Sequence, residues 1–266
     1  MLTTGARRAV RAWTVLVLVF LYAPLLLVVI NAFNASRTFG FPPSGFTLRW
    51  WIDAANSQGM WKSLANSVVV GLGATAIALV LGTMAAFAVQ RYAFFGRNVV
   101  SFLVVLPITL PGIVTGIALN ATFTSALGVT LGLATVIVGH ATFCIVIVFN
   151  NTQARLRRLG TSLDDASADL GASPWQTFRY VTFPMMRGAM VAGAILAFAL
   201  SFDEIVVTTF TAGPTVQTLP IWIFGNLFRP NQAPVINVVA AALTLVAIIP
   251  VWLAQRFGGD PATTRV

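Results

Sequence analysis

The chain has 266 residues, of which 58% are hydrophobic and only 9% charged, and its formal net charge at pH 7 is +9. A soluble domain carries about 25% charged residues, so this chain lacks the charge that a water-facing surface needs. With a mean hydropathy of +0.87, it is expected to be an all-α integral membrane protein. The arginines are scattered at the ends of apolar runs, a pattern that argues against nucleic-acid binding.

Six apolar segments are long enough to cross a bilayer, whose core needs about 20 consecutive apolar residues per helix. We expect spans at residues 12–33, 63–90, 99–123, 129–149, 188–210 and 235–254. Pro107 and Pro111 interrupt the third span. The first span follows several arginines, as a signal peptide would, but its length predicts an uncleaved helix. Residues 1–266 are therefore expected to form a single transmembrane domain.

The basic residues predict the orientation of these spans, because cytoplasmic segments carry an excess of arginine and lysine. If the N-terminus is cytoplasmic, twelve basic residues lie in inner segments. The outer segments then hold only four, which are Arg37, Arg49, Lys62 and Arg229. This asymmetry predicts that both termini are cytoplasmic, together with the long connection at residues 150–187.

That connection is a polar island in an apolar chain. A helix is expected to begin at Thr161 or Ser162, with Asp164 and Asp165 in its first turn, where acids favour the helix dipole. Gly171 is expected to end it in the left-handed conformation.

A second short helix is expected to follow the first. It begins at Ser173, has Pro174 at its first position, and ends at Pro184 before the fifth span. Two interpretations of the whole connection are open. It is either an amphipathic elbow that rests on lipid headgroups or a docking element for a soluble partner.

The spacing of the connection resembles the EAA motif of permease subunits in type I ATP-binding-cassette importers. That motif reads Glu-Ala-Ala, three residues, Gly, nine residues, then Ile-x-Leu-Pro. The matching positions here are Asp165, Ala166, Ser167, Gly171, Val181, Phe183 and Pro184. Four of these residue types differ from the motif, and its spacing is kept.

The resemblance covers essentially the whole chain and implies one half of a transport pore in a bacterial inner membrane. It implies two separate ATPase subunits docked on the connection, and a solute-binding protein outside. A two-fold pore needs two such connections, so a second homologous permease is expected, as a heterodimer rather than a homodimer. ATP and magnesium would belong to the ATPase, and no cofactor is expected on this chain. The sequence has no phosphate-binding G-x-x-x-x-G-K-[ST] loop and no catalytic group, so we do not expect an enzyme.

Two isolated side chains lie in the fourth span. His140 has no second metal ligand nearby in the sequence, so a packed or hydrogen-bonded core histidine is expected rather than a metal site. Cys144 is the single cysteine and is expected to be a small buried residue.

Asp203 and Glu204 lie about 15 residues into the expected fifth span, or roughly 22 Å from its inner end at 1.5 Å per residue. An intramembrane carboxylate costs about 3 kcal/mol on insertion scales, so it usually faces a bundle interior or a watery path. Adjacent positions point about 100° apart, so we expect one acid to face a path and the other to cap or pair. A structural pair held by arginine or backbone donors is the alternative.

The run S-F-D-E ahead of T-x-G-P resembles the polyamine branch of these importers, and in particular the C-type permeases of spermidine/putrescine systems. Asp203 and Glu204 would then contact a cationic solute, with Phe202 and Trp222 as further candidates. Aromatic residues of the outer loops offer cation–π contacts or, alternatively, an interfacial belt. Other solutes of the same importer family remain open: ferric iron, an amino-acid derivative or an inorganic anion. A stand-alone secondary transporter that uses the two acids as ion sites is the alternative from another class.

Overall fold

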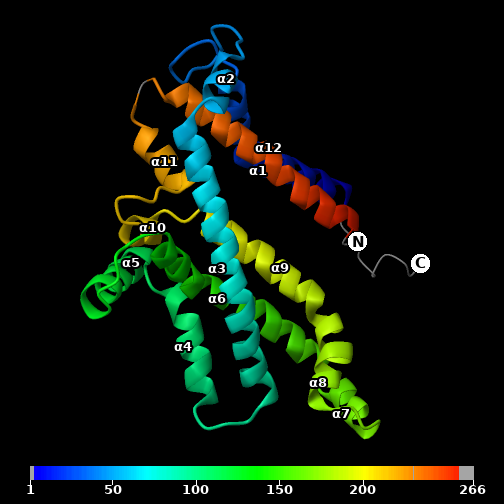
Figure 1. Ribbon diagram of the computed structural model, residues 1–266. Coiled ribbons are helices and arrows are strands. Elements are labelled where there is room, and N and C mark those ends of the chain that lie inside the picture. The colour runs from blue at the N-terminus through cyan, green and yellow to red at the C-terminus, as the bar shows by residue number, and fades with distance from the viewer. Residues whose placement is uncertain (1–2, 230, 258–266) are drawn as a thin grey trace. The chain divides into compact units, whose positions relative to one another are not determined.

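The structure is a computed structural model that describes residues 3–229 and 231–257, with the backbone alone for residues 249–257. Within these ranges the regular structure is helical, apart from an isolated antiparallel bridge between Asn34 and Phe46 (Figure 1). In chain order the elements are α1 (Thr4–Asn31), α2 (Arg49–Ala55), α3 (Gln58–Arg91), α4 (Arg97–Thr109), α5 (Gly112–Ala121), η1 (Thr122–Ala126), α6 (Leu133–Leu159), α7 (Ser162–Asp169), α8 (Pro174–Thr177), η2 (Phe178–Thr182), α9 (Phe183–Phe202), α10 (Val206–Thr211), α11 (Leu219–Asn226) and α12 (Ala233–Phe257). The two η elements are π-helical turns.

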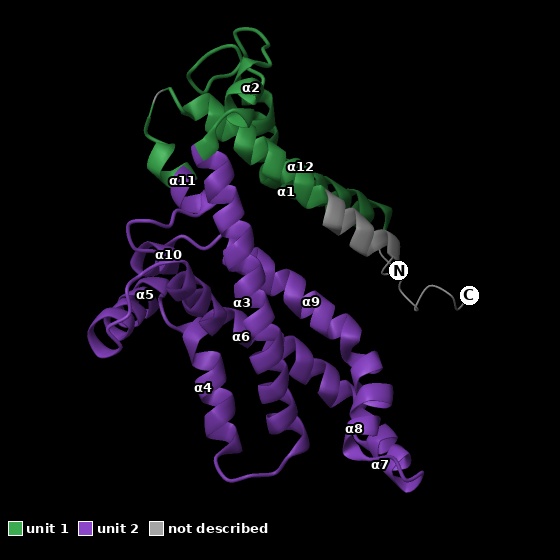
Figure 2. Cartoon of the chain, in the orientation of Figure 1, with its two compact units in different colours: residues 1–58, 223–266 green, residues 59–222 purple. Residues whose placement is uncertain are grey.

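The chain divides into two compact units (Figure 2). One contains both ends of the chain, and in it α12 packs against α1 and α2. The ring of Trp50 is buried there, and its Nε1 donates to the carbonyl oxygen of Asn34 at 2.8 Å. Beyond the three arginines near its start, the side chains of α1 are mainly apolar yet mostly exposed, which is the surface that a helix facing lipid or another subunit presents.

The other unit, Gly59–Trp222, is built around α3, α6 and α9, which share a buried apolar cluster. Alanines and glycines line these helices and let their backbones come close, as is usual where apolar area gives no drive to associate. A Cβ atom added at Gly82 of α3 would lie 2.8 Å from the carbonyl oxygen of Ile145 in α6. Cys144 is fully buried in this core, as the sequence predicts.

Four helical stretches in the described ranges are long and apolar enough to cross a membrane: Thr4–Asn31, Gln58–Arg91, Leu133–Leu159 and Pro174–Phe202. A bent pair, α4 with Gly112–Ala126, makes a fifth candidate, and its two parts meet at 105°. The bend falls at Leu110, which is extended because the ring of Pro111 disfavours the helical conformation before it. The described part of α12 at Ala233–Ile248 is apolar but shorter.

The stretch 188–210, expected as one span, is interrupted in the structure. The helix α9 ends at Phe202, and α10 begins only at Val206. The interruption has a local cause, because the carboxylate of Glu204 accepts a hydrogen bond from the backbone N–H of Val207 at 2.9 Å. A side chain that caps a new helix start favours ending the previous helix. We call residues 203–205 the acidic break.

Candidate functional site

The helix α7 begins and ends where the sequence predicts. It starts after Thr161, and its glycine stop, Gly171, has a φ of +83°. The N–H of Gly171 donates to the carbonyl of Ala168 at 2.8 Å, and that of Ala172 donates to the carbonyl of Ser167 at 3.1 Å. This pair of bonds is the Schellman arrangement, which satisfies the last carbonyls of a helix and needs a left-handed residue.

The next helix also begins as predicted, with Ser173 as its N-cap and a capping box formed with Gln176. The prediction that Pro184 ends this helix is wrong, because helical structure continues from α8 through η2 into α9. Proline has no N–H and its ring clashes with the carbonyl four residues earlier. The π-helical turn accommodates the proline, because its wider hydrogen-bonded loop leaves more room before the ring. In this turn the N–H of Phe183 donates to the carbonyl of Phe178, five residues back.

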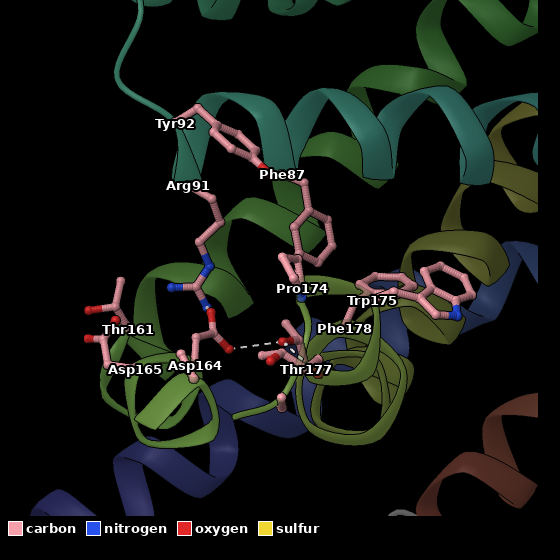
Figure 3. Close-up of a pocket in the computed structure, with 13 residues that line it drawn as sticks. Phe87, Arg91, Tyr92, Thr161, Asp164, Asp165, Pro174, Trp175, Thr177 and Phe178 are labelled. Carbon is pink, nitrogen blue, oxygen red and sulfur yellow. Dashed lines mark hydrogen bonds and ion pairs between the residues drawn. The ribbon is translucent and has the colours of Figure 1, made fainter. Parts of the chain in front are cut away.

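An arginine from α3 holds the connection in place (Figure 3). Arg91 Nη2 lies 2.8 Å from Asp164 Oδ2, and the other carboxylate oxygen accepts from the hydroxyl of Thr182 at 2.9 Å. Arg91 also donates to the carbonyl of Gly160. We call Arg91, Asp164 and Thr182 the clamp, because they tie α7 both to the end of α3 and to the start of α9. Sequence reasoning missed the clamp, since only the fold brings these distant positions together.

The motif residues divide into an exposed group and a packed group. Asp165, Ala166, Gly171 and Pro184 are exposed, whereas Ser167 and Val181 are half-buried. Figure 3 shows Asp165 on the side of α7 away from Thr177. Ser167 belongs to the packing side, where its hydroxyl lies 3.0 Å from that of Thr177.

Large apolar side chains accompany the exposed group. Leu170 is 90% exposed, Tyr180 70% and Trp175 65%. An open hollow of about 660 Å³ lies between the end of α3 and this loop, and the rings of Phe87 and Trp175 are among its lining (Figure 3). Exposed apolar side chains gathered beside polar ones are typical of surfaces that contact either a protein partner or a membrane.

The two acids of the acidic break have different surroundings. Glu204 is half-buried and its carboxylate caps α10, as described above. Asp203 is exposed, and within the described residues its carboxylate makes no hydrogen bond or ion pair. The capping by Glu204 agrees with the expectation that one of the two acids caps or pairs, while the expectation that the other faces a path stays a prediction. Glu204 also lines a small cavity of about 170 Å³ together with Leu110 and Thr115, from the bend between α4 and α5.

The two aromatic candidates differ in the same way. The ring of Phe202 lies 5.8 Å from that of Phe198 and is half-buried. Trp222 is 6% exposed, and its indole lies against Gly59 in the first turn of α3. Trp222 therefore presents little ring surface to a solute in this structure.

His140 is the hydrogen-bonded core histidine that the sequence predicts. Its side chain is fully buried, with Nδ1 2.8 Å from the hydroxyl of Ser201 and Nε2 2.8 Å from the hydroxyl of Thr208. These two partners flank the acidic break, one on α9 and the other on α10.

Comparison with protein families gives one match, described as "Binding-protein-dependent transport system inner membrane component", over residues 78–258. The putrescine transport system permease protein PotI of Escherichia coli K12 is 33% identical over 258 residues, covering 92% of this chain and 91% of that protein. The spermidine/putrescine permease PotC of the same strain is 31% identical over 241 residues, covering 91% and 90%. A Salmonella typhi protein named as a 2-aminoethylphosphonate transport system permease, PhnV, is 30% identical over 249 residues, covering 92% and 94%.

Two solved structures share the fold. A bacterial ABC transporter involved in the import of the acidic polysaccharide alginate superposes with a TM-score of 0.72 at 15% identity, covering 97% of this chain and 99% of that one. The inward-facing MetNI methionine ABC transporter gives a TM-score of 0.59 at 20% identity, covering 75% and 92%.

Proposed function

Because the chain belongs to the family of binding-protein-dependent transport system inner membrane components, it is the permease subunit of an ATP-binding-cassette importer, and we propose that its solute is a small alkylammonium cation such as putrescine or spermidine. The solutes named for PotI, PotC and PhnV all carry an alkylammonium group. The single observation that carries the proposal is the open carboxylate of Asp203 at a break in an apolar helix. An unpaired carboxylate is costly there unless it meets water or a cation.

We propose six spans at the segments expected from the sequence, with the fifth interrupted at the acidic break, and with both termini in the cytoplasm. The contact between Arg91 and Asp164 supports part of this topology, because it requires the connections after α3 and after α6 to lie on the same side of the membrane. The arginine excess in these two connections favours the cytoplasmic side.

The exposed side of α7 is proposed as the seat of an ATPase subunit. The lipid alternative is disfavoured, because Asp164, Asp165 and Asp169 would lie at an anionic cytoplasmic leaflet. The exposed side chain of Leu170 supports a protein groove as the occupant. ATP and magnesium would be bound by two such ATPase subunits. The other proposed partners are a second homologous permease and an extracytoplasmic solute-binding protein.

In the proposed mechanism, the motion of the ATPase reaches the pore through α7 and the clamp. Closure of the ATPase dimer moves α7, and the clamp passes this movement to α3 and to the start of α9. The two permease halves then expose the solute path to one side and afterwards to the other. Asp203 offers its carboxylate to an ammonium group during passage.

Uptake by the reconstituted importer tests the solute assignment. Asp203→Asn should raise the KM for putrescine about tenfold to a hundredfold, since hydrogen bonds to charged groups contribute about 1.5–3 kcal/mol. Glu204→Gln serves as the matched control, because the amide oxygen of glutamine still accepts from Val207 and should keep KM within about threefold.

The same assay separates the alternatives. An unchanged putrescine KM in Asp203→Asn would refute the role of this carboxylate. If 2-aminoethylphosphonate but not putrescine competes for binding to the importer, the solute is an amino-phosphonate instead of a polyamine. Uptake that continues without ATP would instead favour a secondary transporter.

A further inference from the structure

The acidic break is bridged by one buried side chain from a neighbouring helix. His140 of α6 contacts Ser201, in the last turn of α9, through one ring nitrogen, and Thr208, in the first turn of α10, through the other. All three side chains are buried, at 0–3% exposure. We propose that His140 is a positioning residue that holds the two halves of the broken helix and thereby sets where the carboxylate of Asp203 lies.

The hydrogen bonds around His140 have a definite direction. The hydroxyl of Thr208 donates its single proton to the carbonyl of Glu204 at 2.7 Å, so it can only accept from His140. Nε2 of the ring is therefore the donor, and Nδ1 of an uncharged imidazole accepts from the hydroxyl of Ser201. A polar chain thus runs from α9 through the ring to the backbone of the break itself.

The geometry leaves Asp203 as the open group of the break. Glu204 is used twice, since its carbonyl accepts from Thr208 and its carboxylate caps α10 at Val207. Asp203 lies between two positions that hydrogen bonds anchor, Ser201 and Glu204. Its own carboxylate makes no hydrogen bond or ion pair with the described residues. Without the bridge, α9 and α10 keep their packing against α6 but lose the side chain that holds both flanks of the break, so the direction of the Asp203 side chain is less closely fixed.

The packing around the ring supports a positioning role. Both α9 and α10 contact α6, so a residue on α6 can hold the two at once. A Cβ atom at Gly139, next to His140, would already contact Thr211 and Val207 of α10 at 3.4 Å. Because the ring is fully buried, its nitrogens have no water to replace a lost partner.

Cysteine labelling tests the proposal without reference to any solute. In a Cys144→Ala background, the thiol introduced by Asp203→Cys is labelled with a water-soluble thiosulfonate in membranes. His140→Leu should change the labelling rate at least about fivefold, and His140→Gln, which keeps a donor and an acceptor, should restore most of it. Thr142→Ala is the matched control, because among the described residues this α6 hydroxyl bonds within its own helix, to the Gly139 carbonyl.

Transport gives the second readout and rests on the proposed function. With Asp203 in place, His140→Leu should raise the putrescine KM about tenfold while kcat changes less, and His140→Gln should recover it. If His140→Leu fails to insert, Ser201→Ala and Thr208→Val each remove one link and should give the same labelling change.

An unchanged labelling rate in His140→Leu, or in both single-link variants, overturns the proposal. If His140→Leu changes the labelling rate but the parent importer takes up no putrescine, the positioning role of His140 stands and the solute assignment is refuted.

Discussion

Replacing Arg91 with glutamine removes the positive member of the clamp and should weaken the attachment of the ATPase. The guanidinium holds Asp164 from one side while Thr182 holds it from the other, so α7 is anchored at two points. Without Arg91 the start of α7 is tied to α9 alone. The surface that α7 offers to a partner is then less well fixed, and binding has to restore the lost order.

The magnitude follows from the burial of the pair. The side chains of Arg91 and Asp164 are 13% and 26% exposed, so the pair is neither a surface ion pair nor a fully buried one. Surface pairs contribute about 0.2–1 kcal/mol, and breaking a buried pair costs about 3–5 kcal/mol. An intermediate coupling of about 1–2 kcal/mol corresponds to roughly a fivefold to thirtyfold rise in the Kd of the ATPase.

The assay is a titration of purified ATPase against the detergent-solubilised permease, for Arg91→Gln, Asp164→Asn and the double variant. If the two side chains act as a pair, the double variant should bind about as weakly as either single one. Arg97→Gln is the matched control, because Arg97 begins α4 directly after the same connection and lies outside the clamp. A Kd within twofold of the parent for Arg91→Gln, or strictly additive losses, would refute the clamp as a determinant of docking.

Three glycines give further predictions. A Cβ atom at Gly171 would meet nothing within 4 Å, but its φ of +83° strains any other residue by about 1–2 kcal/mol, so Gly171→Trp should disturb the exposed end of α7 locally. We expect it to leave membrane insertion unchanged yet weaken ATPase binding at least tenfold, measured by the same titration. Gly82→Ala should lower the free energy of unfolding by about 1–3 kcal/mol in detergent melts, because its Cβ would press on the backbone of α6 at Ile145. Gly73→Ala, on the same helix, should cost less, since its added Cβ would meet only side-chain atoms of Ile137, the nearest being Cγ2 at 3.1 Å, and no backbone atom. Equal losses at Gly73 and Gly82 would contradict the role of backbone contact.

The polar loop could be predicted because its rules are local. A left-handed glycine, a serine N-cap and a proline in the first turn each act within a few residues, so Gly171 and Ser173 marked their helix ends correctly. The prediction for Pro184 was wrong because it applied an equally local rule at a position where the surrounding helix makes an exception. A proline usually ends a helix, and only the π-helical turn before it allows the helix to continue here.

The acidic break and the clamp could not be predicted in the same way. By hydropathy, residues 188–210 form one apolar segment and predict one helix. In the structure α9 ends within this segment, because the carboxylate of Glu204 caps α10. The partners of His140 and Arg91 lie on other helices, and a single sequence does not say which helices meet. Burial of His140 was expected, but its bridging of α9 and α10 required the tertiary structure.

The π-helical turn at Phe178–Thr182 joins two segments that the sequence predicts as separate helices into one continuous helix. From Pro174 to Phe202 the backbone is helical for 29 residues, or about 43 Å at 1.5 Å per residue. A continuous helix of this length resists bending better than two helices joined by a flexible link at Pro184 would. Its two ends are Pro174, next to Trp175 and close to α7, and Phe202, which Asp203 follows directly, so the polar loop and the acidic break belong to the same stiff element.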